Sequence, residues 1–166
     1  LLVLDTETTG LKKPIGVVEV AWLELDDDLN IVEGSEEVYL TNPQLPIEPG
    51  ASNTHGIRDE DITDDLPVLS QLEWPEGEVF LICHNVSYDR PLVEGYMNVV
   101  GSMCTYHLAR RFLPGAPNHR LQTLSEYCEL SEETPHRALG DIMTTSWLLK
   151  YMAEGSDMTL GEMMDY

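Results

Sequence analysis

Carboxylates occur at three places in the sequence where their types and spacing suit metal-assisted chemistry on a phosphate. Asp5 and Glu7 stand two residues apart at the end of the first apolar run, and such residues face the same side of a strand. Asp89 follows a second apolar run, and Asp141 lies near the start of the longest helical pattern. Hard oxygen ligands of this kind favour two Mg²⁺ or Mn²⁺ ions over zinc, and two such ions can hold a phosphodiester for in-line displacement.

His136 precedes Asp141 by five residues and is the candidate general base. Five residues of helix turn through about 500°, so the two side chains would diverge by about 140° if both were helical. His136 follows Pro135. We therefore expect it in the loop before the helix, where an imidazole beside a fixed carboxylate can accept a proton near neutral pH.

Each of these residues also has an ordinary structural interpretation. Acids are common in the turns at strand ends, and an Asp ahead of a Pro-led helix is a favoured N-cap. A histidine beside an amphipathic helix is common on protein surfaces. No single position decides between the two interpretations. Their combination on three separate segments favours a metal site.

The composition limits the number of domains and the kinds of ligand that we expect. The chain has 166 residues, of which 42% are hydrophobic, and we expect one domain covering residues 1–166. The 30 acidic residues outnumber the 9 Lys and Arg residues, and a net charge of −21 taken alone argues against nucleic acid as a ligand. A solvated acidic surface, of the kind that suits high salt, accounts for most of this charge. Several cations flank the motifs, which leaves room for a locally basic rim.

The cysteines and the hydropathy pattern indicate the cellular compartment in which we expect the protein. Three scattered cysteines predict no disulfide framework and no zinc knuckle, and they fit a reducing environment. The sequence has neither a signal-peptide pattern nor an apolar run long enough for a bilayer. We therefore expect a cytoplasmic protein with no membrane association.

The order of the elements predicts an α/β fold with a mixed sheet. Antiparallel strands are expected over residues 1–5, 16–25 and 31–40, and a further buried strand over 78–84. Residues 42–56 are expected to form an irregular loop, because they contain three prolines and two glycines. Helices are expected at 61–72, 89–100, 105–113, 121–128 and 137–154, with a short one after residue 159.

Three motifs together resemble the DEDDh branch of the DEDD exonuclease superfamily. They are Asp5-Thr6-Glu7-Thr8-Thr9-Gly10, His84-Asn85-x-x-Tyr88-Asp89 and His136-x-x-x-x-Asp141. The sister branch carries Tyr where this chain has Arg137, so it does not fit. Within the branch, the stretches 104–115 and 136–139 are most similar to the bacterial exonuclease X group, followed by polymerase III proofreading subunits.

The resemblance implies an RNase H-like fold with a five-stranded mixed sheet flanked by helices. It implies that two Mg²⁺ or Mn²⁺ ions are bound, that a general base deprotonates water, and that terminal phosphodiesters are hydrolysed from 3′ to 5′ with release of 5′-nucleotides. The residues assigned to these roles are Asp5, Glu7, Asp89 and Asp141 for the metals and His136 for the base. Thr8 and Leu11 are expected against the terminal nucleotide, with His55 and Asn85 near the pocket wall.

Three alternatives remain open at the level of sequence. The chain could act on RNA 3′ ends, because metals and phosphates are common to both polymers and discrimination depends on contacts to the 2′-OH. It could serve as a proofreading module with a DNA polymerase as its partner, or as a non-catalytic module that binds nucleic acid. We expect DNA rather than RNA. The sequence does not predict the oligomeric state.

Overall fold

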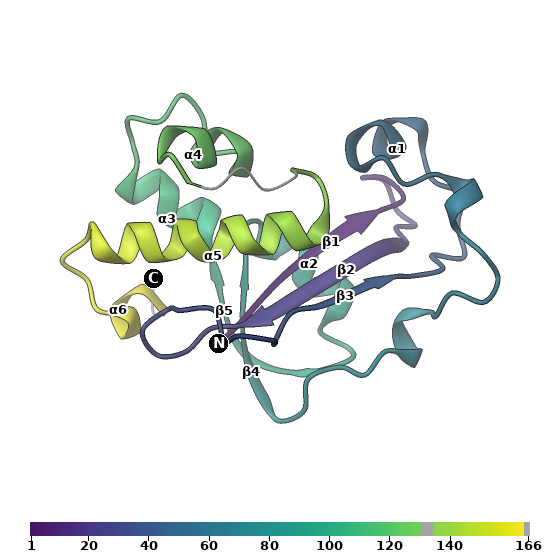
Figure 1. Cartoon of the computed structure of the whole chain (residues 1–166), viewed down its shortest axis with the longest axis horizontal. Helices are drawn as coiled ribbons and strands as arrows, with labels where there is room; N and C mark the ends of the chain where they lie inside the picture. The colour runs from purple at the N-terminus through teal and green to yellow at the C-terminus, as the bar shows by residue number, and fades with distance from the viewer. Residues whose placement is uncertain (131–134, 165–166) are drawn as a thin grey trace.

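A five-stranded sheet with the order β3-β2-β1-β4-β5 forms the centre of the molecule (Figure 1). The computed structural model describes residues 1–130 and 135–164. Strand β1 (Leu2–Thr8) pairs antiparallel with β2 (Val17–Glu24), which pairs antiparallel with β3 (Glu37–Leu40). On its other side β1 runs parallel to β4 (Glu78–Cys83), and β4 runs parallel to β5 (Asn98–Cys104). The predicted α/β fold with a mixed sheet is confirmed.

Helices cover both faces of this sheet (Figure 1). Helix α5 (Ala138–Glu154) crosses one face over β1 and β2, and α3 (Thr105–Phe112) and α4 (Leu121–Tyr127) pack against it. Helix α2 (Val86–Val93) contacts the sheet at β4 and β5. Two short helices complete the set in the described residues, α1 (Pro49–His55) and α6 (Leu160–Met164). None of the helices in the described part of the chain is long and apolar enough to cross a membrane.

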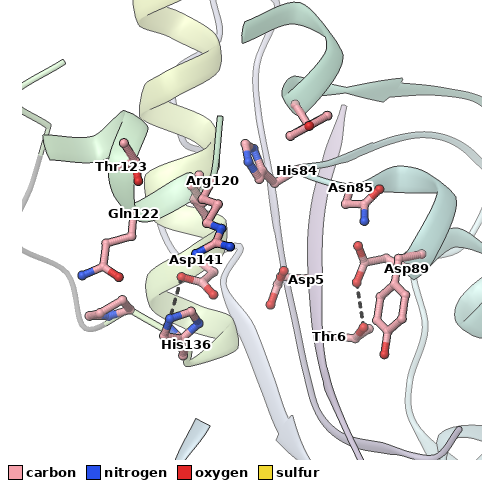
Figure 2. Close-up of a pocket in the computed structure, with 14 residues that line it drawn as sticks. Asp5, Thr6, His84, Asn85, Asp89, Arg120, Gln122, Thr123, His136 and Asp141 are labelled. Atoms are coloured by element: carbon pink, nitrogen blue, oxygen red, sulfur yellow. Dashed lines mark hydrogen bonds between the residues drawn. The ribbon is translucent and has the colours of Figure 1, made fainter. Parts of the chain in front are cut away.

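Side chains of β1 alternate between the two faces of the sheet, and this alternation places the polar residues that follow. Val3 belongs to the core beneath α5, whereas Leu2 and Leu4 belong to the core on the α2 side. Asp5 lies two residues after Val3, so its side chain faces the α5 side of the sheet, where it lines a pocket (Figure 2). Strand β1, at the centre of the sheet, therefore places the carboxylate of Asp5 in that pocket.

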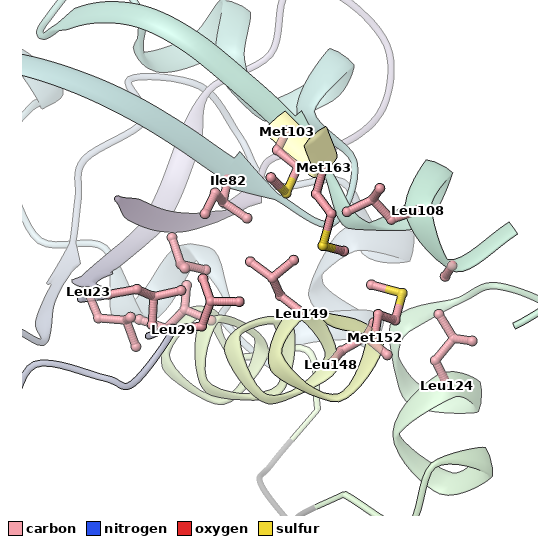
Figure 3. Close-up of a cluster of buried hydrophobic side chains, with 14 of the residues drawn as sticks. Leu23, Leu29, Ile82, Met103, Leu108, Leu124, Leu148, Leu149, Met152 and Met163 are labelled. Atoms are coloured by element: carbon pink, nitrogen blue, oxygen red, sulfur yellow. The ribbon is translucent and has the colours of Figure 1, made fainter. Parts of the chain in front are cut away.

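The core beneath α5 fixes the helix that carries Asp141. Leu148, Leu149 and Met152 of α5 are almost fully buried in one cluster with Ile82 of the sheet, and Figure 3 shows Leu149 directed toward the sheet, with Leu148 and Met152 nearer to Leu124. Burying a side chain of this size contributes about 1.5–3 kcal/mol. The position of α5 relative to β1 is therefore set by packing and does not depend on the pocket.

The predicted helix over residues 89–100 is wrong. Helix α2 begins at Val86 and ends at Val93, and residues 98–104 form strand β5. Strand β5 is an edge strand in which only Met103 is buried, so it lacks the apolar alternation that predicts a strand. The fifth strand was implied only by the family resemblance.

The interpretation of residues 42–56 as a loop is also wrong, because this segment contains α1. Pro49 occupies the first turn of α1, and Gly56 ends it with a φ of 78°. Proline at the start and glycine after the end of a helix are favoured positions, but the same residues in one short segment resemble a loop composition.

Three further elements differ from the prediction. The expected helix over residues 61–72 is absent, and two 3₁₀ turns at Asp59–Asp61 and Leu69–Gln71 lie on either side of Pro67. The strand expected over residues 31–40 shortens to β3, since the segment before it forms only an isolated bridge. The first strand is longer than predicted and extends to Thr8. The helices expected over residues 105–113, 121–128 and 137–154 and after residue 159 are confirmed.

Candidate active site

Asp5, Glu7 and Asp141 form a compact group of carboxylates. One side-chain oxygen from each lies within 4.8 Å of the other two. Asp5 and Glu7 face the same side of β1, and Asp141 comes from the first turn of α5. The structure brings together three residues predicted as metal ligands, and their oxygens could share one divalent cation.

Asp89 approaches the same pocket from α2. It is 4% exposed, and its Oδ1 accepts a hydrogen bond of 2.7 Å from the hydroxyl of Thr6. Thr6 stands between Asp5 and Glu7 in β1, so its side chain points to the opposite face of the sheet, where α2 packs. Asp5, Asp89 and Asp141 all line the pocket, and Figure 2 shows their carboxylates around its centre. The bond from Thr6 that orients Asp89 was not predictable from the motif.

The electrostatics of these carboxylates fit a cation site. Burial, followed by repulsion from Asp89 and Asp141, raises the pKa of Asp5 well above its usual range. Burial and the charge of Asp141 raise the pKa of Glu7 to about 8. Burial raises the pKa values of Asp89 and Asp141 to about 6. A hydrogen bond from Thr6 acts in the opposite direction on Asp89, and the proximity of His136 does so on Asp141. Bound divalent cations would relieve this repulsion, so the donor set fits Mg²⁺ or Mn²⁺.

His136 lies in the turn before α5, as predicted from Pro135. Its backbone has a φ of 58°, a conformation uncommon for residues other than glycine, and its N–H donates to Oδ1 of Asp141 over 3.3 Å. The side chain is exposed and lines the pocket beside Asp141 (Figure 2). The structure thus joins the candidate base to a candidate metal ligand through one hydrogen bond.

Glu19 holds the segment that carries His136. It is 2% exposed in β2, directly opposite Glu7 in the strand register. Its carboxylate accepts bonds from Nε of Arg137 at 3.1 Å, from Nη2 of Arg137 and from the backbone N–H of Ala138 at 2.9 Å. The sequence suggested no role for Glu19. The available signal was an acid within an otherwise apolar strand.

The loop after β1 is fixed from two sides. Thr8 is buried, and its Oγ1 lies 2.7 Å from the hydroxyl of Tyr88, which donates to the carbonyl of Gly10 over 3.1 Å. Nδ1 of His55 accepts the N–H of Ile57, so its Nε2–H donates to the carbonyl of Thr8 over 3.1 Å. Thr8 and His55 therefore support the loop by hydrogen bonds, and neither is among the residues that line the pocket.

Leu11 and Asn85, the other two predicted substrate-binding residues, do not take part in the hydrogen bonds that Thr8 and His55 make to this loop. Leu11 is 81% exposed at the tip of the same loop and lies outside the pocket lining. Asn85 lines the pocket immediately before α2 (Figure 2). Of the four residues predicted to bind substrate, Thr8 and Leu11 against the terminal nucleotide and His55 and Asn85 near the pocket wall, only Asn85 lines the pocket.

The pocket has a volume of about 670 Å³, within the range of ordinary small-ligand sites. His84 forms part of its wall, where Nε2–H donates to the carbonyl of His119 over 2.9 Å and Nδ1 accepts from the hydroxyl of Thr105 over 3.0 Å. Burial lowers the pKa of His84 to about 4, so this imidazole is neutral near pH 7. Sequence reasoning included His84 in a motif but gave it no role. Its position shows that it joins the end of β4 to the segment before α4.

Comparison with protein families identifies the class. Residues 2–149 match the RNase T family model, described as exonuclease. The chain belongs to this exonuclease family. The predicted family is confirmed, and with it the RNase H-like fold. This family is one of hydrolases of the exonuclease type.

Solved structures support the same assignment. Exonuclease X in complex with 5′ overhanging duplex DNA is 31% identical and superposes with a TM-score of 0.83, over 99% of this chain and 97% of that one. Exonuclease I of E. coli in complex with a dT13 oligonucleotide is 18% identical, with a TM-score of 0.74 over 99% of this chain and 42% of that one. The second likeness shows the fold alone, whereas the first confirms the predicted similarity to the exonuclease X group.

Curated relatives include polymerases. The PolC-type DNA polymerase III of Listeria innocua is 30% identical over 157 residues, which is 88% of this chain and 11% of the polymerase. The PolC-type DNA polymerase III of Caldanaerobacter subterraneus is 28% identical over 165 residues, which is 92% of this chain and 11% of that protein. The chain spans about a tenth of the length of these relatives.

Proposed function

We propose that this chain is a 3′→5′ exonuclease that hydrolyses terminal phosphodiesters of DNA with two divalent cations, Mg²⁺ or Mn²⁺. The observation that carries the proposal is the group formed by Asp5, Glu7 and Asp141, whose oxygens lie within 4.8 Å of one another at the pocket. His136 beside this group supplies a proton acceptor, and membership of the exonuclease family fits this chemistry.

The carboxylates and His136 have separate roles in this proposal. Asp5, Glu7 and Asp141 would hold one cation, and Asp89 together with Asp5 would hold the second. The cations supply Lewis acidity that activates water and stabilises the charge developing on the phosphate. His136 takes the proton of the attacking water, and the hydrogen bond between its N–H and Asp141 keeps it beside the reacting atoms.

The remaining steps follow from the bonds exchanged. The water oxygen forms a bond to phosphorus while the bond between phosphorus and the 3′ oxygen breaks. The 3′ oxygen takes up a proton and leaves as a hydroxyl, and the product is a 5′-nucleotide. Asn85 in the pocket would contact the terminal nucleotide, and Leu11 on the loop after β1 would lie against it, with Thr8 and His55 supporting that loop. Positioning of this kind is the main contribution of the protein.

A digestion experiment tests the proposal. Single-stranded DNA, duplex DNA and RNA of matched sequence, each labelled at the 5′ end, are incubated with Mg²⁺, Mn²⁺ or EDTA at several salt concentrations. We expect stepwise shortening from the 3′ end and release of 5′-nucleotides with either metal, and none in EDTA. Metal-independent cleavage, or shortening from the 5′ end, would overturn the proposal.

Three substitutions test the assigned residues in the same assay. Asp5→Ala or Asp141→Ala should abolish metal-dependent cleavage, and full activity of either variant would refute the ligand assignment. His136→Ala should lower the rate by a factor of about 100 or more, because it removes the general base. A rate close to that of the unmodified protein would exclude His136 from this role.

Similar proteins favour DNA as the polymer and a DNA polymerase as the partner. The exonuclease X structure contains duplex DNA, and the PolC-type relatives are DNA polymerases, so DNA is favoured over RNA and a DNA polymerase is the candidate partner. An RNA 3′-end exonuclease is the second candidate, and faster digestion of RNA than of the matched DNA would select it. Co-purification with a DNA polymerase would support the proofreading association.

A further inference from the structure

Arg120 stands out among the residues that line the pocket. Within the described part of the chain it is the only Lys or Arg in the pocket lining. It lies immediately before α4, its side chain is exposed, and Figure 2 shows its guanidinium directed into the pocket. A cation at this place is notable in a chain of net charge −21.

The guanidinium of Arg120 has no ion-pair partner among the described residues. Ion pairs in this part of the chain occupy Arg58, Arg90 and Arg137. No carboxylate of the described residues lies within 4.0 Å of Arg120, although Asp5, Asp89 and Asp141 line the same pocket. An ordinary solvated surface arginine is the plain alternative, and it does not account for a position inside the pocket.

The backbone of Arg120 is fixed while its side chain stays available. Its N–H donates to Oδ1 of Asn118 over 3.0 Å, and its carbonyl accepts the N–H of Leu124 over 3.0 Å. The preceding carbonyl, that of His119, accepts the Nε2–H of His84 over 2.9 Å. The base of the side chain is therefore held in place relative to the end of β4, so a ligand has only the side chain to order.

We propose that Arg120 binds the backbone phosphate next to the scissile one, on its 5′ side. This inference rests on the proposed function, in which the scissile phosphate sits among the metal-binding carboxylates. A guanidinium that lies in the same pocket, outside ion-pair distance of those carboxylates, can reach the next phosphate along the strand. Its planar fork can donate two parallel N–H bonds to phosphate oxygens, which a lysine cannot do.

The test compares substrates with one phosphodiester and with many. Arg120→Ala and Arg120→Lys are assayed on a single-stranded oligodeoxynucleotide and on thymidine 5′-p-nitrophenyl phosphate, which has no neighbouring phosphate. For the oligonucleotide we expect Arg120→Ala to raise KM about tenfold with kcat unchanged, and Arg120→Lys to fall between. Cleavage of the nitrophenyl ester should stay unchanged. Arg58→Ala, which removes the same charge from an exposed site, is the control.

A binding measurement separates this inference from catalysis. In the Asp141→Asn background, adding Arg120→Ala should raise the Kd for the oligonucleotide about tenfold and lower the slope of log K against log salt by about one. Unchanged binding and KM would overturn the inference. Equal losses on both substrates would also overturn it, because Arg120 would then act at the scissile phosphate. An unmodified protein inactive on both substrates would instead refute the proposed function.

Discussion

Arg137, in the segment before α5, reaches across to Glu19 in β2, and the two side chains are joined by two hydrogen bonds. The Glu19 side chain is 3% exposed and that of Arg137 is 48% exposed. Because the same carboxylate also accepts the N–H of Ala138, it fixes the start of α5 and the residue that precedes Arg137, His136. A buried acid that adds to the repulsion among the metal-site carboxylates thus has a positioning role.

Glu19→Ala should therefore slow the reaction and weaken the fold. We expect kcat to fall about tenfold with little change in KM, because His136 loses its fixed position. The free energy of unfolding should fall by about 2–3 kcal/mol, less than for a fully buried pair because Arg137 is half exposed. Glu24→Ala, an exposed position on the same strand, is the control for both measurements. An unchanged kcat in Glu19→Ala would show that the pair only stabilises the fold.

Asp141→Asn should abolish cleavage and yet stabilise the metal-free protein. The raised pKa of Asp141, about 6, means that ionising this carboxyl costs more free energy in the fold than in the unfolded chain, so the ionised group destabilises the metal-free fold at pH 8. Neutralising it should raise the free energy of unfolding by about 1–2 kcal/mol in EDTA. Thermal unfolding in EDTA and then in Mn²⁺ checks both points, since the variant should also lose most of the stabilisation by Mn²⁺. Asp157→Asn, at an exposed position, should show neither change.

His84 should make the fold sensitive to acid. Its pKa is about 4 in the fold and near 6.5 when unfolded, so between these values the unfolded chain binds the extra proton. Its contribution to stability is therefore present above pH 6.5 and is lost as the pH falls toward 4. The stability difference between the unmodified protein and His84→Gln should shrink by up to about 3 kcal/mol over that range. Urea unfolding at pH 7 and pH 4.5 measures this difference.

His107→Gln provides the control for that experiment, because His107 is exposed on α3. This substitution removes an imidazole without breaking the contacts of the pocket wall. A stability difference that stays constant with pH in His84→Gln would mean that His84 is not a buried neutral imidazole in solution.

Tyr88→Phe should loosen the loop after β1 without touching a carboxylate. The substitution removes the contact with Thr8 and the bond to the carbonyl of Gly10. We expect a loss of about 1 kcal/mol in stability and a several-fold rise in KM for an oligonucleotide, with kcat near that of the unmodified protein. Steady-state kinetics checks this, with Tyr151→Phe, on the exposed side of α5, as the control. A drop in kcat alone would place Tyr88 in a different role.

Local patterns were sufficient for much of the site. The spacing of Asp5 and Glu7 in a strand predicted that both would face one side, and Pro135 predicted that His136 would precede the helix. Both positions are confirmed. These predictions succeeded because each depends on the geometry of a single element.

Contacts between distant elements were not predictable in this way. The bond from Thr6 to Asp89 joins β1 to α2, and the pair formed by Glu19 and Arg137 joins β2 to the start of α5. Arg120 enters the pocket only because α4 packs against α5. Strand β5 was missed for a related reason, since an edge strand takes its conformation mainly from hydrogen bonds to its neighbour.

The candidate metal-site carboxylates come from β1, α2 and α5, and this separation along the sequence has a consequence for the growing chain. While the protein is being synthesised, Asp5, Glu7 and Asp89 emerge well before His136 and Asp141. No partial chain that ends before α5 contains all of these residues, so under the proposed function cleavage would begin only when α5 has docked on β1. Contacts between residues so far apart in the chain form slowly, because the entropy of loop closure opposes them. Under the proposed function, activity would therefore report on completed folding, and nucleic acid near the ribosome would not meet a partly folded nuclease.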